Sequence, residues 1–541
     1  MVRPVAKTIN KTSHKPKAQQ ELHVSSLKQI VHGAAITFVL GMAGYLIAFL
    51  IRVQAARYFG PQQYGLYELI NTILGILFLA CALGIPNGAS RYFIEYIVKK
   101  KDGLLRGYIQ FVLYIPVVVG VICSVLLYIF ASQITAFFVV DSSFTWLLQI
   151  ISIIIPFSMA TSTINMLLLL KKKSFASQFG HNFLEKVVVL CSVIAAWFYH
   201  LTIQTVVIGL ALAYLASFIF SYFAYKKYIK IPEVKPIYVA KEWFAFSWPL
   251  LFASVFGFLL SWTDNLVIAK YLHETQLGVY GIAYSLTSYL SFIPSIFLTL
   301  FVPVLAELLL TKQKAFHTIF ARVSVWAFCI TYYLGLVLLF FPKQILSILF
   351  GAAYADGWSS VTILVFSFLA MSYFVFYNTV LLIKKDTQFL LWSSFAFAIF
   401  NLLLNIILVK QFQTITVVAF GSALSIIGIR ISEYIRCKKH INEKVPWLYL
   451  LKIIVAGLCS IVIVKALFVF VFNHSTLPQI IKLIIAGITY TLLFGATIIL
   501  SGLLTNDDKM IMHTIFTRIG ISEKSMQYWW NALQKFIINK D

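Results

Sequence analysis

Long apolar stretches separated by short polar or basic segments dominate this 541-residue sequence. A helix that crosses a bilayer needs about 20 mostly apolar residues. That length predicts about fourteen membrane-spanning helices, at roughly 30–55, 66–90, 107–130, 144–170, 176–199, 203–224, 246–268, 281–308, 318–341, 358–383, 388–409, 415–435, 448–472 and 479–503. The pattern therefore predicts an all-α polytopic membrane protein.

Composition supports this fold class. Hydrophobic residues make up 60% of the chain and charged residues 11%, and the mean hydropathy is +0.89. A soluble protein has about 45–50% apolar and about 25% charged residues. The additional apolar residues of this chain cannot all be buried in a water-soluble core. The net charge of +24 would suggest nucleic acid in a soluble protein. Here the basic residues lie between apolar segments, where they report topology, and no nucleic-acid partner is expected.

The distribution of basic residues predicts the orientation. With the N-terminus inside, most of the 43 Lys and Arg residues fall in predicted cytoplasmic tails and loops. Only four fall in predicted external loops, namely Arg57, Lys270, Lys343 and Lys410. This asymmetry is what the positive-inside rule requires. We therefore expect a multi-pass protein of the cell (plasma or inner) membrane with both termini in the cytoplasm.

An internal duplication relates the first six helices to the second six. ARYFGPQQYGLY at 56–67 recurs as AKYLHETQLGVY at 269–280, an offset of 213 residues, and the same offset relates 165–172 to 378–385. We call the first pair of segments the two elbows, because each joins consecutive predicted helices. Six helices, an even number, lie within the offset. The copies are therefore predicted to be parallel repeats around a central cleft.

This duplication gives a predicted domain plan. Two six-helix bundles occupy the repeats, a C-terminal helix pair follows, and polar segments flank or join them. The boundaries are 1–28 for a basic cytoplasmic tail, 29–225 and 246–436 for the bundles, 226–245 for an amphipathic cytoplasmic linker, 447–503 for helices 13 and 14, and 504–541 for a cytoplasmic tail with an interfacial helix at 521–538.

Ionisable side chains within apolar segments are candidates for the cleft, because each costs about 2.5–3.5 kcal/mol on insertion scales. Arg52 and Asp264 lie in the outer thirds of helices 1 and 7, which are repeat equivalents, and Asn265 aligns with Arg52. We expect these residues to line the cleft from opposite sides, and an outer-surface ion pair or snorkelling is the alternative. Glu68 begins helix 2 and either lines the cleft or caps the helix.

Two further cations have open roles. Arg91, at the cytoplasmic end of helix 2, either meets substrate or reaches water. Lys186 lies mid-helix beside Glu185, and His181 is one turn earlier on the same face. A neutralised internal pair is favoured for Lys186 over a cleft role. We find no catalytic or metal-binding signature, and no cofactor is expected.

Several of these stretches resemble a known family. Over about residues 28–505 the chain resembles the polysaccharide and oligosaccharide flippases of the multidrug/oligosaccharidyl-lipid/polysaccharide (MOP) superfamily, the Wzx, MurJ and SpoVB-like proteins. The resemblance is carried by ARYFGPQQYGLY, by Leu83–Pro86 with Ser90–Tyr92, and by WTDNLVIAKYLHETQLGVY from Trp262. It implies that a polyprenyl-diphosphate-linked oligosaccharide moves from the inner to the outer leaflet by alternating access. The purpose implied is cell-surface polysaccharide or cell-wall assembly.

The resemblance also implies partners and roles. The implied partners are the lipid-linked glycan, membrane lipids and other polysaccharide-assembly proteins. Because a guanidinium binds phosphate oxygens bidentately, we expect Arg91 to meet the entering headgroup and Arg52 to meet it near exit. Asp264 and Glu68 are candidates for a coupling cation, with H⁺, Na⁺ and the membrane potential all left open. The two elbows form a candidate outer gate, whose residues are Arg57, Tyr67, Lys270 and Tyr280.

Two other functions are compatible with a polytopic membrane protein. A MATE-like, cation-coupled exporter of small molecules belongs to the same superfamily but predicts twelve helices. A membrane enzyme would need catalytic groups on a sizeable external loop. The longest external loop, at 342–357, offers only Asp356, so the chain is expected not to be an enzyme.

Overall fold

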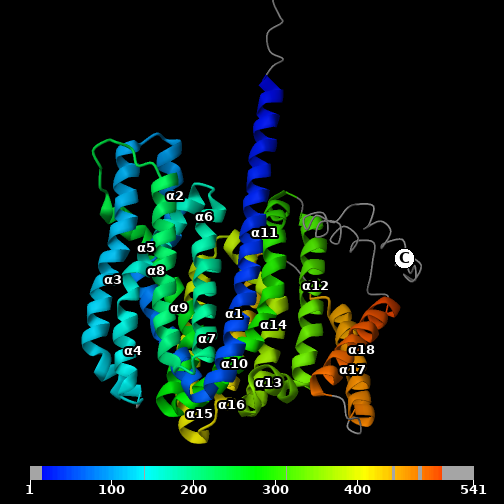
Figure 1. Cartoon of the computed structure of the whole chain (residues 1–541). Helices are drawn as coiled ribbons and strands as arrows, with labels where there is room; N and C mark the ends of the chain where they lie inside the picture. The colour runs from blue at the N-terminus through cyan, green and yellow to red at the C-terminus, as the bar shows by residue number, and fades with distance from the viewer. Residues whose placement is uncertain (1–14, 139, 312, 442–444, 473–477, 502–541) are drawn as a thin grey trace, which may run out of the picture. The chain divides into compact units, whose positions relative to one another are not determined.

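The computed structural model describes residues 15–501 except 139, 312, 442–444 and 473–477 (Figure 1). Every element in these ranges is helical, as predicted. The first half contains α1 (Lys15–Ala82), α2 (Ile85–Val98), α3 (Asp102–Phe138), α4 (Ser143–Ser152), α5 (Ile154–Leu170), α6 (Ser174–Gln178), η1 (Phe179–Leu184), α7 (Glu185–Phe198) and α8 (Ile203–Tyr228).

The second half has the equivalent helices, divided differently in places, and adds a helix pair. It contains α9 (Ala240–Tyr271), α10 (His273–Ser288), η2 (Tyr289–Ser291), α11 (Phe292–Thr311), α12 (Gln313–Phe340), α13 (Pro342–Phe350), η3 (Ala352–Gly357), α14 (Trp358–Ile383), α15 (Thr387–Phe412), α16 (Ile415–Cys437), α17 (Trp447–Leu467), η4 (Phe468–Phe472) and α18 (Gln479–Leu500).

Twelve segments of the described chain are long and apolar enough to cross a membrane. They agree with the predicted fourteen once two differences are considered. The segment Val39–Ala82 contains predicted helices 1 and 2 together, because α1 continues through the first elbow. Gly60, with φ 71° and ψ 175°, breaks the helical backbone there, and Pro61 follows it. Predicted helix 7 corresponds to α9, which is not among the twelve.

The backbone carries the predicted duplication. Residues with positive φ recur at the offset of 213: Gly60 (71°) with His273 (65°), Lys172 (58°) with Lys385 (61°), and His200 (52°) with Gln413 (48°). Such conformations are uncommon outside glycine. Their recurrence at matched helix ends means that the two halves share turn geometry as well as sequence.

The chain divides into two compact units. Unit 1 comprises Met1–Arg52, Leu77–Ala131 and Thr145–Leu251, and unit 2 comprises Val53–Ile76, Ser132–Phe144 and Phe252–Asp541. The units therefore differ from the predicted bundles, because the first elbow and the end of α3 belong to unit 2. Both elbows lie in one unit.

Unit 1 has an aromatic core around Trp243, whose Nε1 donates to the Tyr96 hydroxyl at 3.0 Å. The predicted linker between the bundles belongs to this unit. Between α8 and α9 it has no helix and lies along the start of α3, where Arg106 donates to the Val234 carbonyl at 2.8 Å. Near the N-terminus, α1 begins at Lys15. This helix therefore includes part of the predicted basic tail at 1–28. The predicted interfacial helix at 521–538 lies outside the described residues.

Candidate functional site

The two elbows pack against each other within unit 2 through a pair of equivalent glycines. A Cβ built on Gly65 would lie 1.8 Å from the Glu274 carbonyl oxygen, and one on Gly278 would lie 1.9 Å from the Pro61 carbonyl oxygen. Pro61 and Glu274 are themselves separated by the repeat offset of 213. The contact is thus reciprocal, and only a residue without a side chain fits at either position.

Polar side chains add to the elbow contact. Gln62 Nε2 donates to Glu274 Oε1 at 3.0 Å. Glu68 is buried, accepts a hydrogen bond from the Tyr64 hydroxyl at 2.6 Å, and packs where Gly281 leaves space. Gly281 is the repeat equivalent of Glu68. The first repeat thus has a carboxylate at this position, and the second repeat has a glycine that leaves space for the carboxylate.

The two elbow cations contact helix ends in the opposite repeat. Arg57 Nε donates to the Leu349 carbonyl at 2.8 Å at the end of α13. Lys270 donates to the Phe137 carbonyl at the end of α3, and its ammonium lies 4.3 Å from the Phe137 ring centroid. Cations are favoured at helix C-termini by the helix dipole. Arg57 and Lys270 therefore join each elbow to the other repeat.

A buried cluster surrounds Asp264, whose side chain is 1% exposed. Ser422 Oγ donates to Asp264 Oδ2 at 2.5 Å, and Asn405 Nδ2 donates to Asp264 Oδ1 at 2.8 Å. The Tyr280 hydroxyl also donates to Oδ2. Asn401 Nδ2 donates to Ser422 Oγ at 3.0 Å. A buried carboxylate without a counter-charge needs such donors, because transfer from water is expensive.

The cluster also contains acceptors without donors. The side-chain oxygens of Asn401 and Asn405 are buried and have no hydrogen-bond partner among the described residues. Both asparagines turn their amide nitrogens toward the cluster, and the Asn405 oxygen faces Gly421. The Asp264 carboxylate is therefore the group of the cluster that can bind a cation or a proton.

Hydrogen bonds connect this cluster to the elbows. Tyr280, which binds Asp264, lies two residues after Gly278 on α10. Asn265, next to Asp264, donates through Nδ2 to Thr72 Oγ1 at 3.0 Å, and Thr72 lies on α1 beyond the first elbow. The Asp264 cluster is thus bonded to the helices that follow both elbows. Tyr67, the repeat equivalent of Tyr280, is buried on α1.

The remaining candidates lie in unit 1. Arg52 is half-buried on α1. Arg91 is exposed on α2, with its guanidinium 4.6 Å from the Phe246 ring centroid. Lys186 Nζ binds Glu185 at 2.9 Å, and His181 binds the other oxygen of the same carboxylate at 2.8 Å. Lys186 is therefore part of an internal ion pair at the start of α7.

Sequence reasoning identified Asp264 and Tyr280 but missed Asn401, Asn405 and Ser422. A signal for the asparagines was present, since two polar residues four positions apart interrupt an apolar stretch and share one helical face. Ser422 is one of three serines on the apolar helix α16, with Ser425 and Ser432. Serines of that kind commonly bond to their own backbone, so its role could not be read from the sequence.

Solved structures with the same fold were found. A MurJ lipid II flippase in an inward closed conformation aligns with a TM-score of 0.65 and 16% identity, over 85% of this chain and 98% of that one. A MATE multidrug transporter of the MOP superfamily aligns in an inward-facing form with a TM-score of 0.62 and 14% identity, over 76% and 98%. A MATE multidrug transporter in an outward-facing conformation aligns with a TM-score of 0.56 and 13% identity, over 76% of this chain and 96% of that one.

These likenesses confirm the predicted MOP-type fold of a multi-pass membrane protein. No curated protein sequence matches the chain. The description "Polysaccharide biosynthesis protein" belongs to the family that matches residues 30–309, which is more than half of the 541 residues. The chain belongs to the polysaccharide biosynthesis protein family.

Proposed function

We propose that the chain is a flippase that moves a polyprenyl-diphosphate-linked oligosaccharide from the cytoplasmic to the outer leaflet by alternating access. The observation that carries this proposal is the reciprocal elbow contact bonded to a buried, cation-compatible carboxylate cluster. In this proposal the elbow contact opens and closes, and the Asp264 cluster binds and releases a cation. Membership of the polysaccharide biosynthesis family supports a glycan substrate, and the shared fold with a lipid II flippase supports a lipid-linked one.

In this proposal the elbows form the outer gate, and their packed arrangement is its closed form. The Gly65–Gly278 contact excludes even a methyl group, so no headgroup can pass between the elbows. Arg57 and Lys270 stabilise the closed form by binding the helix ends. Opening requires these contacts to be exchanged for contacts with water or with substrate.

The Asp264 cluster couples a cation to the gate. A Na⁺ ion bound at Asp264, or a proton on Asp264, neutralises the buried charge. Either event removes the need for the Tyr280 hydroxyl as a donor, because the carboxylate acquires another partner. Tyr280 then becomes free to move with α10, which carries Gly278. The difference in cation affinity between the closed and open forms sets the size of the coupling.

The substrate's diphosphate is bound by arginine. Arg91 meets the headgroup on the cytoplasmic side and Arg52 meets it later, while the prenyl chain stays in lipid. Both termini face the cytoplasm in this orientation, and the membrane is the cell membrane. Replacement of both arginines by glutamine should abolish export of lipid-linked sugar in cells, with normal expression. Intact export in that double variant would remove the arginines from the pathway.

A MATE-like exporter of small molecules is the second candidate, because the same fold is found in a multidrug transporter. The two functions differ in the ligand that the protein retains. Protein extracted from native membrane under mild conditions and examined by mass spectrometry should carry a polyprenyl diphosphate with a sugar headgroup. Absence of that lipid, together with cation-driven release of a cationic dye from proteoliposomes, would favour the exporter.

A further inference from the structure

Arg91 on α2 is held against an aromatic ring that comes from the second repeat. Its guanidinium carbon lies 4.6 Å from the centroid of the Phe246 ring on α9 and 5.5 Å from the centroid of the neighbouring Tyr92 ring. Attraction between a cation and an aromatic ring holds a long side chain in one place. The repeat equivalents of Arg91 and Phe246 are Val304 and Gly33. The duplication therefore carries this pair in one copy only.

Three contacts fix the beginning of α9 against α2, all within unit 1. Gly84 precedes α2, and a Cβ built on it would lie 2.4 Å from a carbonyl oxygen of α9. The Phe246 ring meets the buried Tyr92 ring edge to face, with the centroids 5.5 Å apart. One turn further along α2, the Tyr96 hydroxyl accepts a hydrogen bond from Trp243 at 3.0 Å. The ring that supports Arg91 is thus itself fixed by a buried core.

The Arg91 guanidinium keeps its N–H groups available. The side chain is exposed, and within the described part of the chain it forms no hydrogen bond or ion pair. Glu95, the carboxylate one turn along α2, is bound by Lys99 Nζ at 2.6 Å instead. Glu242, in the first turn of α9, is exposed to solvent. A guanidinium stacked by its face still presents the N–H groups at its edge to a ligand.

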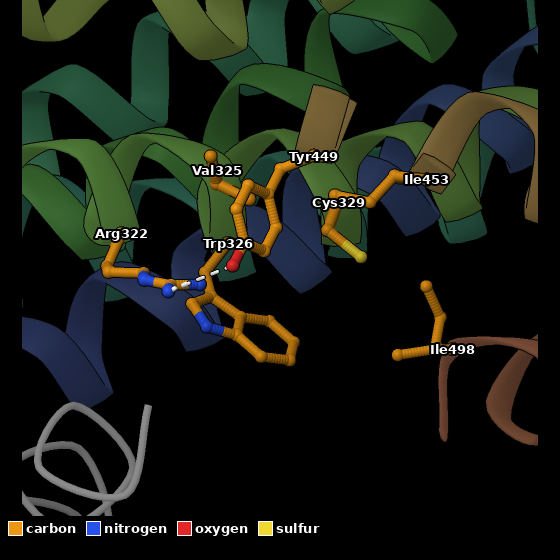
Figure 2. A pocket seen from close by; sticks show the side chains of 7 residues that line it. All are labelled: Arg322, Val325, Trp326, Cys329, Tyr449, Ile453 and Ile498. Atoms are coloured by element: carbon orange, nitrogen blue, oxygen red, sulfur yellow. Dashed lines mark hydrogen bonds between the residues drawn. The ribbon is translucent and has the colours of Figure 1, made fainter. Parts of the chain in front are cut away.

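A second arginine stack, shown in Figure 2, differs in this respect. The guanidinium carbon of Arg322 lies 4.7 Å from the centroid of the Tyr449 ring, but its Nη2 also donates to the hydroxyl of that tyrosine at 3.5 Å. The cavity beside this pair has a volume of about 10 Å³, enough for one water. Phe246 has no hydroxyl, so it supports Arg91 without occupying the N–H groups.

We infer that Phe246 is a positioning residue for the diphosphate of the substrate. Its ring holds the Arg91 guanidinium in place, so that the N–H groups can meet two phosphate oxygens at once. The long arginine side chain is thus ordered before the ligand arrives, which lowers the entropic cost of binding. This inference rests on the proposed function, in which Arg91 binds the entering headgroup. Loss of the ring weakens binding although Arg91 keeps its charge.

Binding of farnesyl diphosphate to the full-length purified protein tests the role of Phe246 without requiring transport. Affinity is measured by calorimetric titration in a neutral detergent, and farnesol serves as the arm without phosphate. Phe246→Leu should weaken binding about two- to fivefold, the loss expected for one cation–π contact. Phe246→Trp keeps an aromatic ring and should bind as the wild type does. Phe246→Met repeats the test if the leucine variant does not fold.

Phe244→Leu is the matched control. Phe244 lies two residues earlier on α9, is half-buried like Phe246, and packs on the Phe111 ring with centroids 4.9 Å apart. This variant should lose thermal stability but bind farnesyl diphosphate as the wild type does.

Four outcomes would overturn the inference. They are wild-type affinity in Phe246→Leu, equal weakening by Phe244→Leu, affinity in Phe246→Trp as low as in Phe246→Leu, and binding of farnesol as tight as that of the diphosphate. Wild-type affinity in Arg91→Gln would remove Arg91 from the proposed substrate path, and the role of Phe246 with it.

Discussion

Gly65 and Gly278, 213 residues apart, occupy the same position in two copies of one elbow and pack against each other's backbone. A methyl group on either would lie within 2 Å of a carbonyl oxygen of the other elbow, at 1.8 Å or 1.9 Å. Duplication placed a small residue at both sides of a symmetric contact. The proposed outer gate depends on this contact between the two glycines.

Substitution of either glycine by alanine should open the elbows. Neither carbonyl can withdraw without moving its helix, so overpacking should cost about 1–3 kcal/mol. Cysteines at Gln62 and Glu274, whose terminal atoms Nε2 and Oε1 form a hydrogen bond of 3.0 Å between the elbows, report on closure through disulfide formation. We expect Gly65→Ala to slow crosslinking several-fold.

Gly487→Ala is the matched control for this experiment, because a Cβ on Gly487 meets no atom within 4 Å. Its crosslinking rate should equal that of the parent double-cysteine protein. Equal rates for Gly65→Ala and Gly487→Ala would show that the glycine contact does not hold the elbows together.

Asp264→Asn should remove cation binding while preserving shape. A cation that binds only the folded protein stabilises it by about 2.7 kcal/mol at 100 times its Kd. Thermal unfolding of the wild type should therefore shift upward with Na⁺, or respond to pH if the coupling ion is H⁺. The variant should show neither response, whereas Glu307→Gln on α11 should retain it. An Asp264→Asn protein with the wild-type ion response would place the ion elsewhere.

Tyr280→Phe should separate cation binding from gate closure. The substitution keeps the ring and removes the hydroxyl that donates to Asp264. The ion-dependent thermal shift should remain, but the rate of the 62–274 disulfide should no longer depend on the ion. Tyr284→Phe, one turn further along α10, tests whether loss of another hydroxyl on this helix also removes the ion dependence of the disulfide rate. An ion-dependent crosslinking rate in Tyr280→Phe would argue against coupling through this residue.

The loop before α15 provides a prediction about acid stability. Arg436 donates to both Asp386 oxygens, at 2.6 and 3.2 Å, and His440 lies at 3.1 Å from one of them. Hydrogen bonds from Arg436 and then His440 lower the pKa of Asp386 to about 2. Because the folded pKa is below the ordinary value of about 3.9, the stabilisation is complete above about pH 4. It is lost as the pH falls through about 2.

Asp386→Asn should accordingly lower the melting temperature at pH 7 and leave a smaller decline between pH 4 and pH 2. Asp356→Asn removes an exposed carboxylate and serves as the comparison. An unchanged melting temperature in Asp386→Asn at pH 7 would mean that the Arg436 pair contributes nothing measurable, as many exposed ion pairs do.

Much of the fold could be predicted because apolar length and charge asymmetry are strong signals in membrane proteins. The offset of 213 could also be found. It recurs in the backbone, where Lys172 and its equivalent Lys385 both have positive φ. The path of the 226–245 linker could not be predicted, because it depends on a hydrogen bond from Arg106 to the Val234 carbonyl, which is distant in sequence. Part of the site was equally hidden. Asp264 stood out as a charge in an apolar helix, but its partners Asn401, Asn405 and Ser422 come from helices far along the chain.

Flipping in proteoliposomes is the most direct test of whether the elbows gate the movement of a lipid-linked sugar. The protein with Gln62→Cys and Glu274→Cys is reconstituted with a fluorescent polyprenyl-diphosphate sugar. Exposure of the headgroup on the far leaflet is then followed under reducing and oxidising conditions. We predict rapid protein-dependent exposure when the protein is reduced, loss of exposure when the disulfide joins the elbows, and recovery on reduction. Exposure no faster than in protein-free vesicles, or exposure unaffected by a fully formed disulfide, would contradict this prediction.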